Sequence, residues 1–110
     1  MVVVADAADD FTYETLNRAF RLLLAGADLV ALEKDRYWMG SDGLMLSAGP
    51  FVAALEYAAG KKAEVIGKPS PAFFLRALRD IGARPGEAAM VGDDIVTDIG
   101  GARACGMKGV

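Results

Sequence analysis

Short apolar runs alternate with segments of helical periodicity along the whole chain. The runs that we expect to form strands are residues 2–4, 29–32, 36–39, 63–66, 88–91 and 107–110. Between them, apolar residues recur every three or four positions, which is the spacing of one face of a helix. Strands that alternate with helices in this way predict an α/β fold built on a parallel sheet.

The clearest helix follows Thr12, whose hydroxyl is suited to cap a helix N-terminus, and ends at Gly26. Its apolar stripe consists of Leu16, Ala19, Phe20, Leu23 and Leu24. A second helix is expected with Pro50 at its first position and Gly60 after its last.

Two more helices are predicted in the second half of the chain. One precedes Gly82 and has Phe74, Leu78 and Ile81 facing inward. The other runs from Thr97 to about Ala104, where small residues would allow close packing. The strand over residues 88–91, between these helices, is expected to be of the buried type.

Composition narrows the chemistry that is available to the chain. The 110 residues are 54% hydrophobic and 25% charged with a net charge of −3, which excludes a disordered tail, a collagen-like repeat and a polybasic nucleic-acid arm. The absence of histidine and the single cysteine exclude Ser-His-Asp and Cys-His pairs, imidazole metal sites and an internal disulfide. Carboxylates, lysine, arginine, hydroxyls and backbone amides remain.

Three carboxylates lie close together in the sequence after the strand predicted over residues 88–91. They are Asp93, Asp94 and Asp98, and Gly92 precedes them. Ligands bind at the carboxyl ends of parallel strands, and oxygen ligands on a short loop suit Mg²⁺. The alternative is that Asp94 or Thr97 caps the following helix and that the acids are simply solvated.

Lys68 is the second candidate, because Gly67 and Pro69 hold it at the exit of another predicted strand. A lysine fixed there would place a compact positive charge against a phosphate. The alternative is a surface lysine in a turn. Together, the lysine and the later acidic loop favour a site for phosphate and magnesium.

Other polar and aromatic residues look structural. Asp6, Asp9 and Asp10 follow an apolar strand, but their spacing does not place two carboxylates around one metal, and we interpret them as turn and helix-capping residues. Tyr37 and Trp38 are expected to pack within a strand.

Two segments of the second half of the sequence resemble a known family. Residues 63–74, with Gly67-Lys68-Pro69, and residues 90–107, with Gly92-Asp93-Asp94, resemble the haloacid dehalogenase superfamily. More narrowly, they resemble its subgroup with an α/β cap domain inserted late in the core. The resemblance implies that residues 1–66 are part of the cap and that residues 67–110 are the C-terminal part of a Rossmann-like, parallel-sheet hydrolase core.

The resemblance also implies a reaction and a role for each matching residue. Enzymes of this family transfer a phosphoryl group to an aspartate, and water then hydrolyses the aspartyl-phosphate with the help of Mg²⁺. By this resemblance Lys68 binds the phosphate and stabilises its charge, and Asp93 is the direct Mg²⁺ ligand. Asp94 and Asp98 match acids that act around the metal through water or by orienting its ligands.

The chain departs from the family pattern at the nucleophile, since no Asp-x-Asp motif occurs in it. We therefore expect a fragment of a phosphatase that acts on small phosphate, pyrophosphate or phosphoamide substrates, and no turnover by this chain alone. The alternative is a non-catalytic α/β module that dimerises or binds a partner through unpaired strand edges. A homodimer formed through the cap domain, a cytoplasmic location and no nucleic-acid or membrane partner are further expectations.

Overall fold

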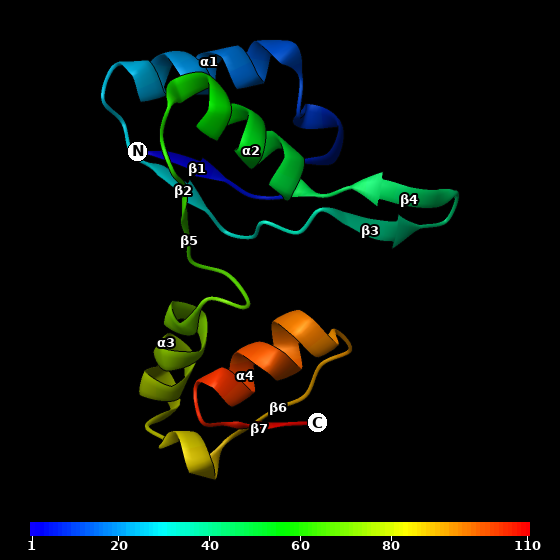
Figure 1. The fold of residues 1–110 in the computed structure, drawn as a ribbon, viewed down its shortest axis with the longest axis vertical. Coiled ribbons are helices and arrows are strands. Elements are labelled where there is room, and N and C mark those ends of the chain that lie inside the picture. Colours follow the sequence, from blue (N-terminus) through cyan, green and yellow to red (C-terminus); the bar gives the residue numbers. More distant parts are fainter. The chain divides into compact units, whose positions relative to one another are not determined.

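A computed structural model describes residues 1–110, which divide into two compact units, residues 1–65 and residues 66–110 (Figure 1). Each unit combines helices with parallel strands, so the predicted α/β class is confirmed. The boundary lies one residue before the predicted one, and the assignment of the units to a cap domain and a hydrolase core stays a prediction. No helix is both long and apolar enough to cross a membrane.

The first unit is built on a three-stranded parallel sheet with two helices along one side of it (Figure 1). Its strands, in spatial order, are β1 (Val2–Val4), β2 (Leu29–Ala31) and β5 (Glu64–Val65). The helices are α1 (Tyr13–Leu24) and α2 (Ala48–Ala59), and a single 3-10 turn, η1 (Ala8–Asp10), follows β1. Val2 pairs with Leu29 and Val30 pairs with Glu64, so the predicted strands are confirmed, β1 with the predicted bounds and β2 and β5 slightly shorter.

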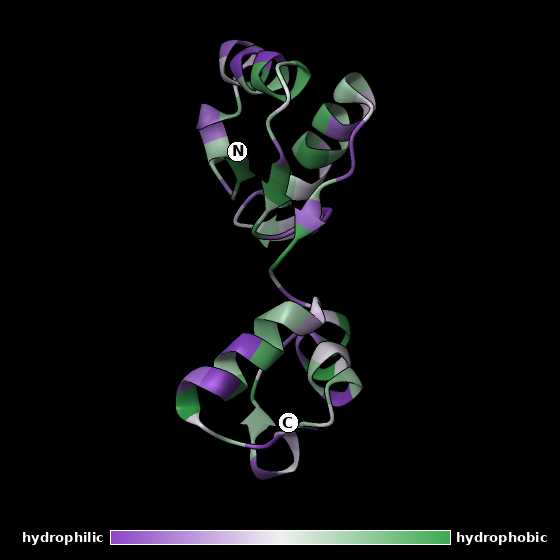
Figure 2. Cartoon of the chain, turned by 90° about the vertical axis from the view of Figure 1, so that its left-hand side faces the viewer, coloured by the Kyte–Doolittle hydropathy of each residue, from purple (hydrophilic) through white to green (hydrophobic).

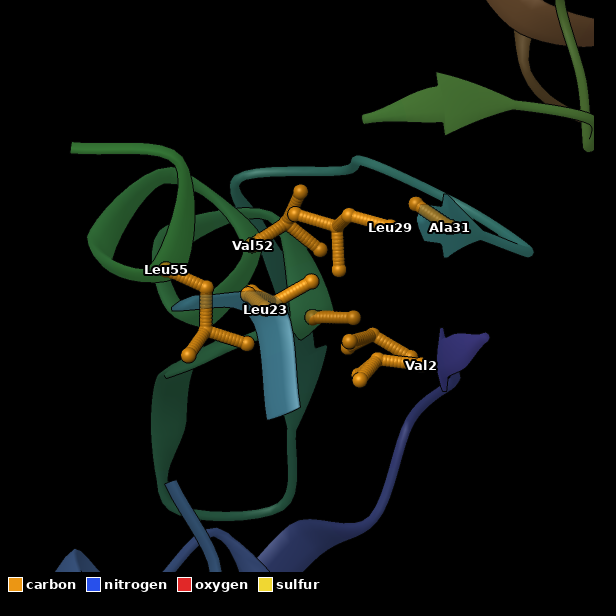
Figure 3. Close-up of a cluster of buried hydrophobic side chains, with 8 residues drawn as sticks. Val2, Leu23, Leu29, Ala31, Val52 and Leu55 are labelled. Atoms are coloured by element: carbon orange, nitrogen blue, oxygen red, sulfur yellow. The ribbon is translucent and has the colours of Figure 1, made fainter. Parts of the chain in front are cut away.

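The core of this unit lies between the sheet and the two helices (Figure 3). Its buried side chains are Val2, Val4, Leu23, Leu29, Ala31, Ala48, Val52 and Leu55. Burying one Val or Leu side chain contributes about 1.5–3 kcal/mol, so this cluster is the main source of stability in the unit. The stripe on α1 is narrower than predicted, because Leu23 is fully buried whereas Leu24 is 62% exposed.

The ends of α1 and α2 follow the sequence signals with one exception. The Thr12 hydroxyl accepts a hydrogen bond from the backbone N–H of Thr15 at 3.1 Å, as expected of an N-cap. α2 ends at Gly60, which has the left-handed φ of 64°. The expectation for Pro50 was wrong, because α2 begins two residues earlier, at Ala48. Proline is tolerated there because the first N–H groups of a helix have no partner within it.

A hairpin formed by β3 (Tyr37–Gly40) and β4 (Gly43–Leu46) extends from the first unit (Figure 1). It is antiparallel, and its second strand was not predicted. Tyr37 and Trp38 lie in the hairpin but remain 53% and 48% exposed, so the prediction that they pack within a strand was wrong.

The second unit combines helices with a two-stranded parallel sheet. Its elements are α3 (Pro71–Ile81), the 3-10 turn η2 (Pro85–Glu87), β6 (Ala89–Met90), the π-helical segment η3 (Ile95–Gly100), α4 (Gly101–Ala104) and β7 (Lys108–Gly109). η3 and α4 replace the single helix predicted from Thr97. Hydrophobic and hydrophilic residues mix along these elements (Figure 2).

The core of the second unit is small. Phe74, Leu78 and Ala102 are its buried apolar side chains, and Gly101 lies so close to the Phe74 ring that an added Cβ would meet it at 2.5 Å. This confirms the close packing predicted at the small residues. Ile81, in contrast, is 70% exposed, so the prediction that it faces inward was wrong. The strand predicted to be buried is also accessible, because the unit provides only one neighbouring strand for it.

Candidate functional site

The acidic loop begins where β6 ends. β6 and β7 run parallel. Just after these paired strands, the backbone N–H of Gly92 donates a hydrogen bond to the carbonyl of Val110 at 3.3 Å. Asp93 and Asp94 therefore leave the sheet at the carboxyl end of a parallel strand, as predicted. This is the end at which open α/β sheets bind their ligands.

Lys68 and Asp98, which lie 30 residues apart in the sequence, form an ion pair in the second unit. Lys68 follows β5 and is joined to Pro69 by a cis peptide bond, whereas Asp98 lies on η3. The Asp98 side chain is 3% exposed and that of Lys68 is 38% exposed. The pair thus holds a partly accessible ammonium group against a buried carboxylate.

Gly92 makes room for this pair. A Cβ built on Gly92 would overlap the carboxylate group of Asp98, and its distance to the Asp98 Cβ would be 2.6 Å. A residue with a side chain would therefore displace Asp98 from its position next to Lys68. Sequence reasoning missed this role, and its one signal was a glycine placed directly before two acids.

Asp94 acts as the N-cap of η3. Its Oδ1 accepts hydrogen bonds from the backbone N–H groups of Val96 at 2.8 Å and Thr97 at 2.7 Å. These bonds, with a smaller contribution from the positive charge of Lys68, lower the pKa of the Asp94 carboxyl group. The capping interpretation of Asp94 is confirmed, and its role around a metal stays a prediction.

The backbone of Asp94 also ties the loop to the ion pair, because its N–H donates to Asp98 Oδ2 at 3.3 Å. η3 is π-helical at this point, since the Ile99 N–H bonds to the Asp94 carbonyl five residues back at 3.2 Å. Single π-helical turns occur frequently at functional sites. Asp98 lies in this turn, and its carboxylate accepts hydrogen bonds both from Lys68 and from the backbone N–H of Asp94.

Asp93 is exposed to solvent in the loop that follows β6. No group of three acidic or sulfur side chains converges on one point. Mg²⁺ binds through one or two carboxylates and takes its other ligands from water and substrate phosphate. One accessible carboxylate, on a loop whose backbone bonds to the partner of Lys68, therefore fits Mg²⁺ with a bound phosphate, and does not fit a cation that needs an all-protein cage.

The other acids that were considered lie in the first unit. Asp6 Oδ1 accepts a hydrogen bond from the backbone N–H of Ala8 at 3.1 Å, and Asp9 and Asp10 belong to the 3-10 turn η1. Their interpretation as residues of a turn is confirmed.

Comparisons with known proteins agree with the resemblance. Residues 65–110 match the family model described as HAD-hydrolase-like. The chain is 54% identical over 111 residues to phospholysine phosphohistidine inorganic pyrophosphate phosphatase from Xenopus laevis. It is 55% identical over 109 residues to human haloacid dehalogenase-like hydrolase domain-containing protein 2. The resemblance to haloacid dehalogenase-like hydrolases is confirmed. These alignments cover 99% of the chain but only 41% and 42% of the relatives.

Solved structures of haloacid dehalogenase-like phosphatases show the same fold. A double mutant of the thermostable NPPase from Geobacillus stearothermophilus matches 99% of the chain with a TM-score of 0.91 at 32% identity, over 44% of its own length. A glycerol phosphate phosphatase from Mycobacterium tuberculosis in complex with magnesium matches 89% of the chain with a TM-score of 0.77 at 36% identity, over 29% of its own length. The chain thus spans less than half the length of each of these relatives.

Proposed function

We propose that this chain supplies the phosphate-binding and magnesium-binding residues of a phosphatase of the haloacid dehalogenase-like family. The observation that carries the proposal is the pairing of Lys68 with buried Asp98, which also bonds to the backbone of the loop that contains Asp93 and Asp94. A phosphate–magnesium pair requires a fixed cation and an accessible carboxylate, and Lys68 and Asp93 would supply them.

Lys68 would stabilise the negative charge of the transferring phosphoryl group. An ammonium group has three N–H donors, and the side chain is 38% exposed, so it can hold Asp98 and still reach a phosphate oxygen. Asp98 is a positioning residue in this scheme, because it acts on the substrate through Lys68. Its burial keeps the carboxylate in one place and thereby fixes the lysine.

Asp93 would hold Mg²⁺, and Asp94 would shape the loop by capping η3. When bound, the metal would neutralise phosphate charge and polarise the phosphorus–oxygen bonds. The phosphoryl acceptor would be an aspartate of the Asp-x-Asp type, a motif that these 110 residues do not contain. We therefore expect no turnover from the chain on its own.

The relatives suggest the substrate class. One is named as a phosphatase of phospholysine, phosphohistidine and inorganic pyrophosphate, and one solved structure is named as a glycerol phosphate phosphatase. We propose that the complete site acts on small phosphate esters, pyrophosphate or phosphoamides. The alternative stays a prediction, namely that the chain is a non-catalytic module that dimerises or binds a partner. The following experiment distinguishes it from the phosphatase proposal.

A chimera tests the proposal directly. The chain would replace the matching segment of the Xenopus laevis phosphatase, to which it is 54% identical, and hydrolysis of pyrophosphate would be measured with Mg²⁺. We expect the chimera to be active. Lys68→Met and Asp93→Asn should each lower kcat by about 10²-fold or more, because each removes charge stabilisation in the transition state.

Asp42→Asn is the matched control, since Asp42 is an exposed acid in the turn of the β3–β4 hairpin. It should leave pyrophosphate hydrolysis within about twofold of the parent chimera. A folded chimera that is inactive, or one that keeps its activity with Asp93→Asn, would contradict the proposal.

A further inference from the structure

The first unit contains an open groove of about 370 Å³ that the phosphatase proposal does not use. It lies among η1, the hairpin and the start of α2. Its lining combines aromatic rings from three segments with two carboxylates, namely Phe11, Trp38, Phe51, Asp6 and Asp9. The remaining lining residues are apolar, and none is basic.

The aromatic wall of the groove is ordered by a ring stack. Phe11 and Phe51 stack in parallel with their centroids 3.9 Å apart and an interplanar angle of 8°. Trp38, from β3, is 48% exposed and lines the same groove. Aromatic rings of this kind offer negative π-electron density to a cation and apolar surface to its carbon atoms.

The charge of the groove is negative. Asp6 and Asp9 are both exposed, and Asp6 keeps its place by accepting the hydrogen bond from Ala8. The electrostatic influence of Asp6 extends to the neighbouring carboxyl group of Glu33, whose pKa is raised mainly by burial and further by Asp35 and Asp6. A cation entering the groove would lie beside two carboxylates and no basic side chain, so its charge would be stabilised.

We propose that this groove binds an organic cation, an alkylammonium group whose carbon chain lies along Trp38 and the phenylalanines and whose charge lies beside Asp6 and Asp9. Apolar walls with a few polar groups of one charge are typical of small-ligand sites. An inorganic cation would gain nothing from the rings, and an anion would be repelled. This site lies within the first unit, so it stands independently of the proposed phosphatase function.

Trp38 is the only tryptophan of the chain, so its fluorescence reports directly on the groove. The 110-residue protein would be titrated with n-butylammonium at constant ionic strength. We expect a saturable change in fluorescence with a Kd in about the millimolar range, as befits a ligand of few atoms. n-Butanol, which has the same carbon chain without the charge, should give a markedly weaker response.

Substitution of the two acids tests the charge requirement. Asp6→Asn keeps an oxygen that can accept the hydrogen bond from Ala8, so it removes the charge with little change in structure. Asp6→Asn and Asp9→Asn should each weaken n-butylammonium binding by about two- to fivefold. Asp42→Asn, in the hairpin turn outside the groove, should leave the Kd unchanged.

The proposal is overturned if n-butylammonium gives no saturable change, if n-butanol binds equally well, or if both acid substitutions leave the Kd unchanged. A second titration with Nα-acetyl-lysine amide identifies the source of the cation. Tighter binding than that of n-butylammonium supports a lysyl side chain as ligand, and weaker binding supports a free amine.

Discussion

At Gly92 there is no room for a side chain, because the carboxylate of Asp98 occupies the space next to its Cα. This close approach links two parts of the site, since Asp98 bonds both to Lys68 and to the backbone N–H of Asp94. Any atom added at Gly92 must move one of these partners. The site therefore depends on a residue that carries no functional group.

Gly92→Ala should lower the free energy of unfolding of the second unit by about 1–3 kcal/mol through overpacking against Asp98. Chemical denaturation followed by NMR intensities in residues 66–110 would measure it. Gly86→Ala is the control, because nothing lies within 4 Å of a Cβ built there, and it should change stability by less than about 0.5 kcal/mol. Equal effects of the two substitutions would show that the contact with Asp98 is not a constraint.

Glu33 offers a test of electrostatics in the first unit. Burial and the nearby Asp35 and Asp6 raise the pKa of Glu33, so the folded state holds this proton more tightly than the unfolded state does. The free energy of unfolding therefore falls as pH rises from the usual carboxyl pKa through the raised one. Ser47 donates a hydrogen bond to the Glu33 carboxylate, and a glutamine could accept it too.

Glu33→Gln should consequently raise Tm near pH 7 and have little effect near about pH 4, where the carboxyl is largely protonated in both states. Thermal unfolding followed by circular dichroism at the two pH values measures this. The exposed Glu64 provides the control substitution, Glu64→Gln. The measured quantity is the Tm of Glu33→Gln minus the Tm of the parent at each pH. A smaller difference at pH 7 than at pH 4 would contradict the assignment.

The sequence was informative about single residues only where their neighbours in the chain determine their role. The interpretation of Asp94 as a helix cap needed only the residues that follow it, and the structure confirms it. The ion pair of Lys68 with Asp98 could not be predicted from spacing, since the two are 30 residues apart and meet only through the fold. The groove lined by Trp38 was not predicted either, because its lining residues come from separate segments that meet only through the fold.

At the scale of the element, helix ends were more predictable than strand partners. Thr12, Gly60 and Gly82 mark helix ends as predicted, because capping depends on local hydrogen bonds and on a left-handed φ that glycine adopts easily. β4 was missed, since Gly43–Leu46 lacks β-branched residues and forms a strand only by pairing with β3. The π-helical form of η3 has no sequence signature of its own.

The two N-cap positions of α1 and α3 give a matched pair of substitutions. Thr12 accepts a hydrogen bond from the Thr15 N–H, whereas the Ser70 side chain makes no capping hydrogen bond at the start of α3. Thr12→Ala should cost about 1 kcal/mol of stability, and Ser70→Ala less than about 0.5 kcal/mol. Denaturant titration measures both. A larger loss at Ser70 than at Thr12 would contradict the capping geometry.

At the scale of the whole molecule, the two units differ in how much apolar surface they bury. The first contains eight buried apolar side chains in one cluster, whereas the second contains three, namely Phe74, Leu78 and Ala102. The two-stranded sheet of the second unit is also too small to be stable without the helices that pack on it. The second unit should therefore be the less stable of the two.

Hydrogen exchange of backbone amides tests this difference. We expect the slowest amides of residues 66–110 to exchange at least about tenfold faster than the slowest amides in α1, α2 and β2, because fewer buried contacts oppose opening. Equal protection in the two units would mean that they unfold together, and the chain would then be one cooperative body.

Binding of Mg²⁺ to the chain is the measurement that tests the central claim most directly. A titration with MgCl₂ followed by amide chemical shifts should produce saturable changes confined to residues 92–98 and to Lys68, and Asp93→Asn should abolish them while Asp42→Asn leaves them intact. Changes that are located elsewhere, or that persist with Asp93→Asn, would contradict the claim that the loop after β6 is the metal-binding part of a phosphatase site.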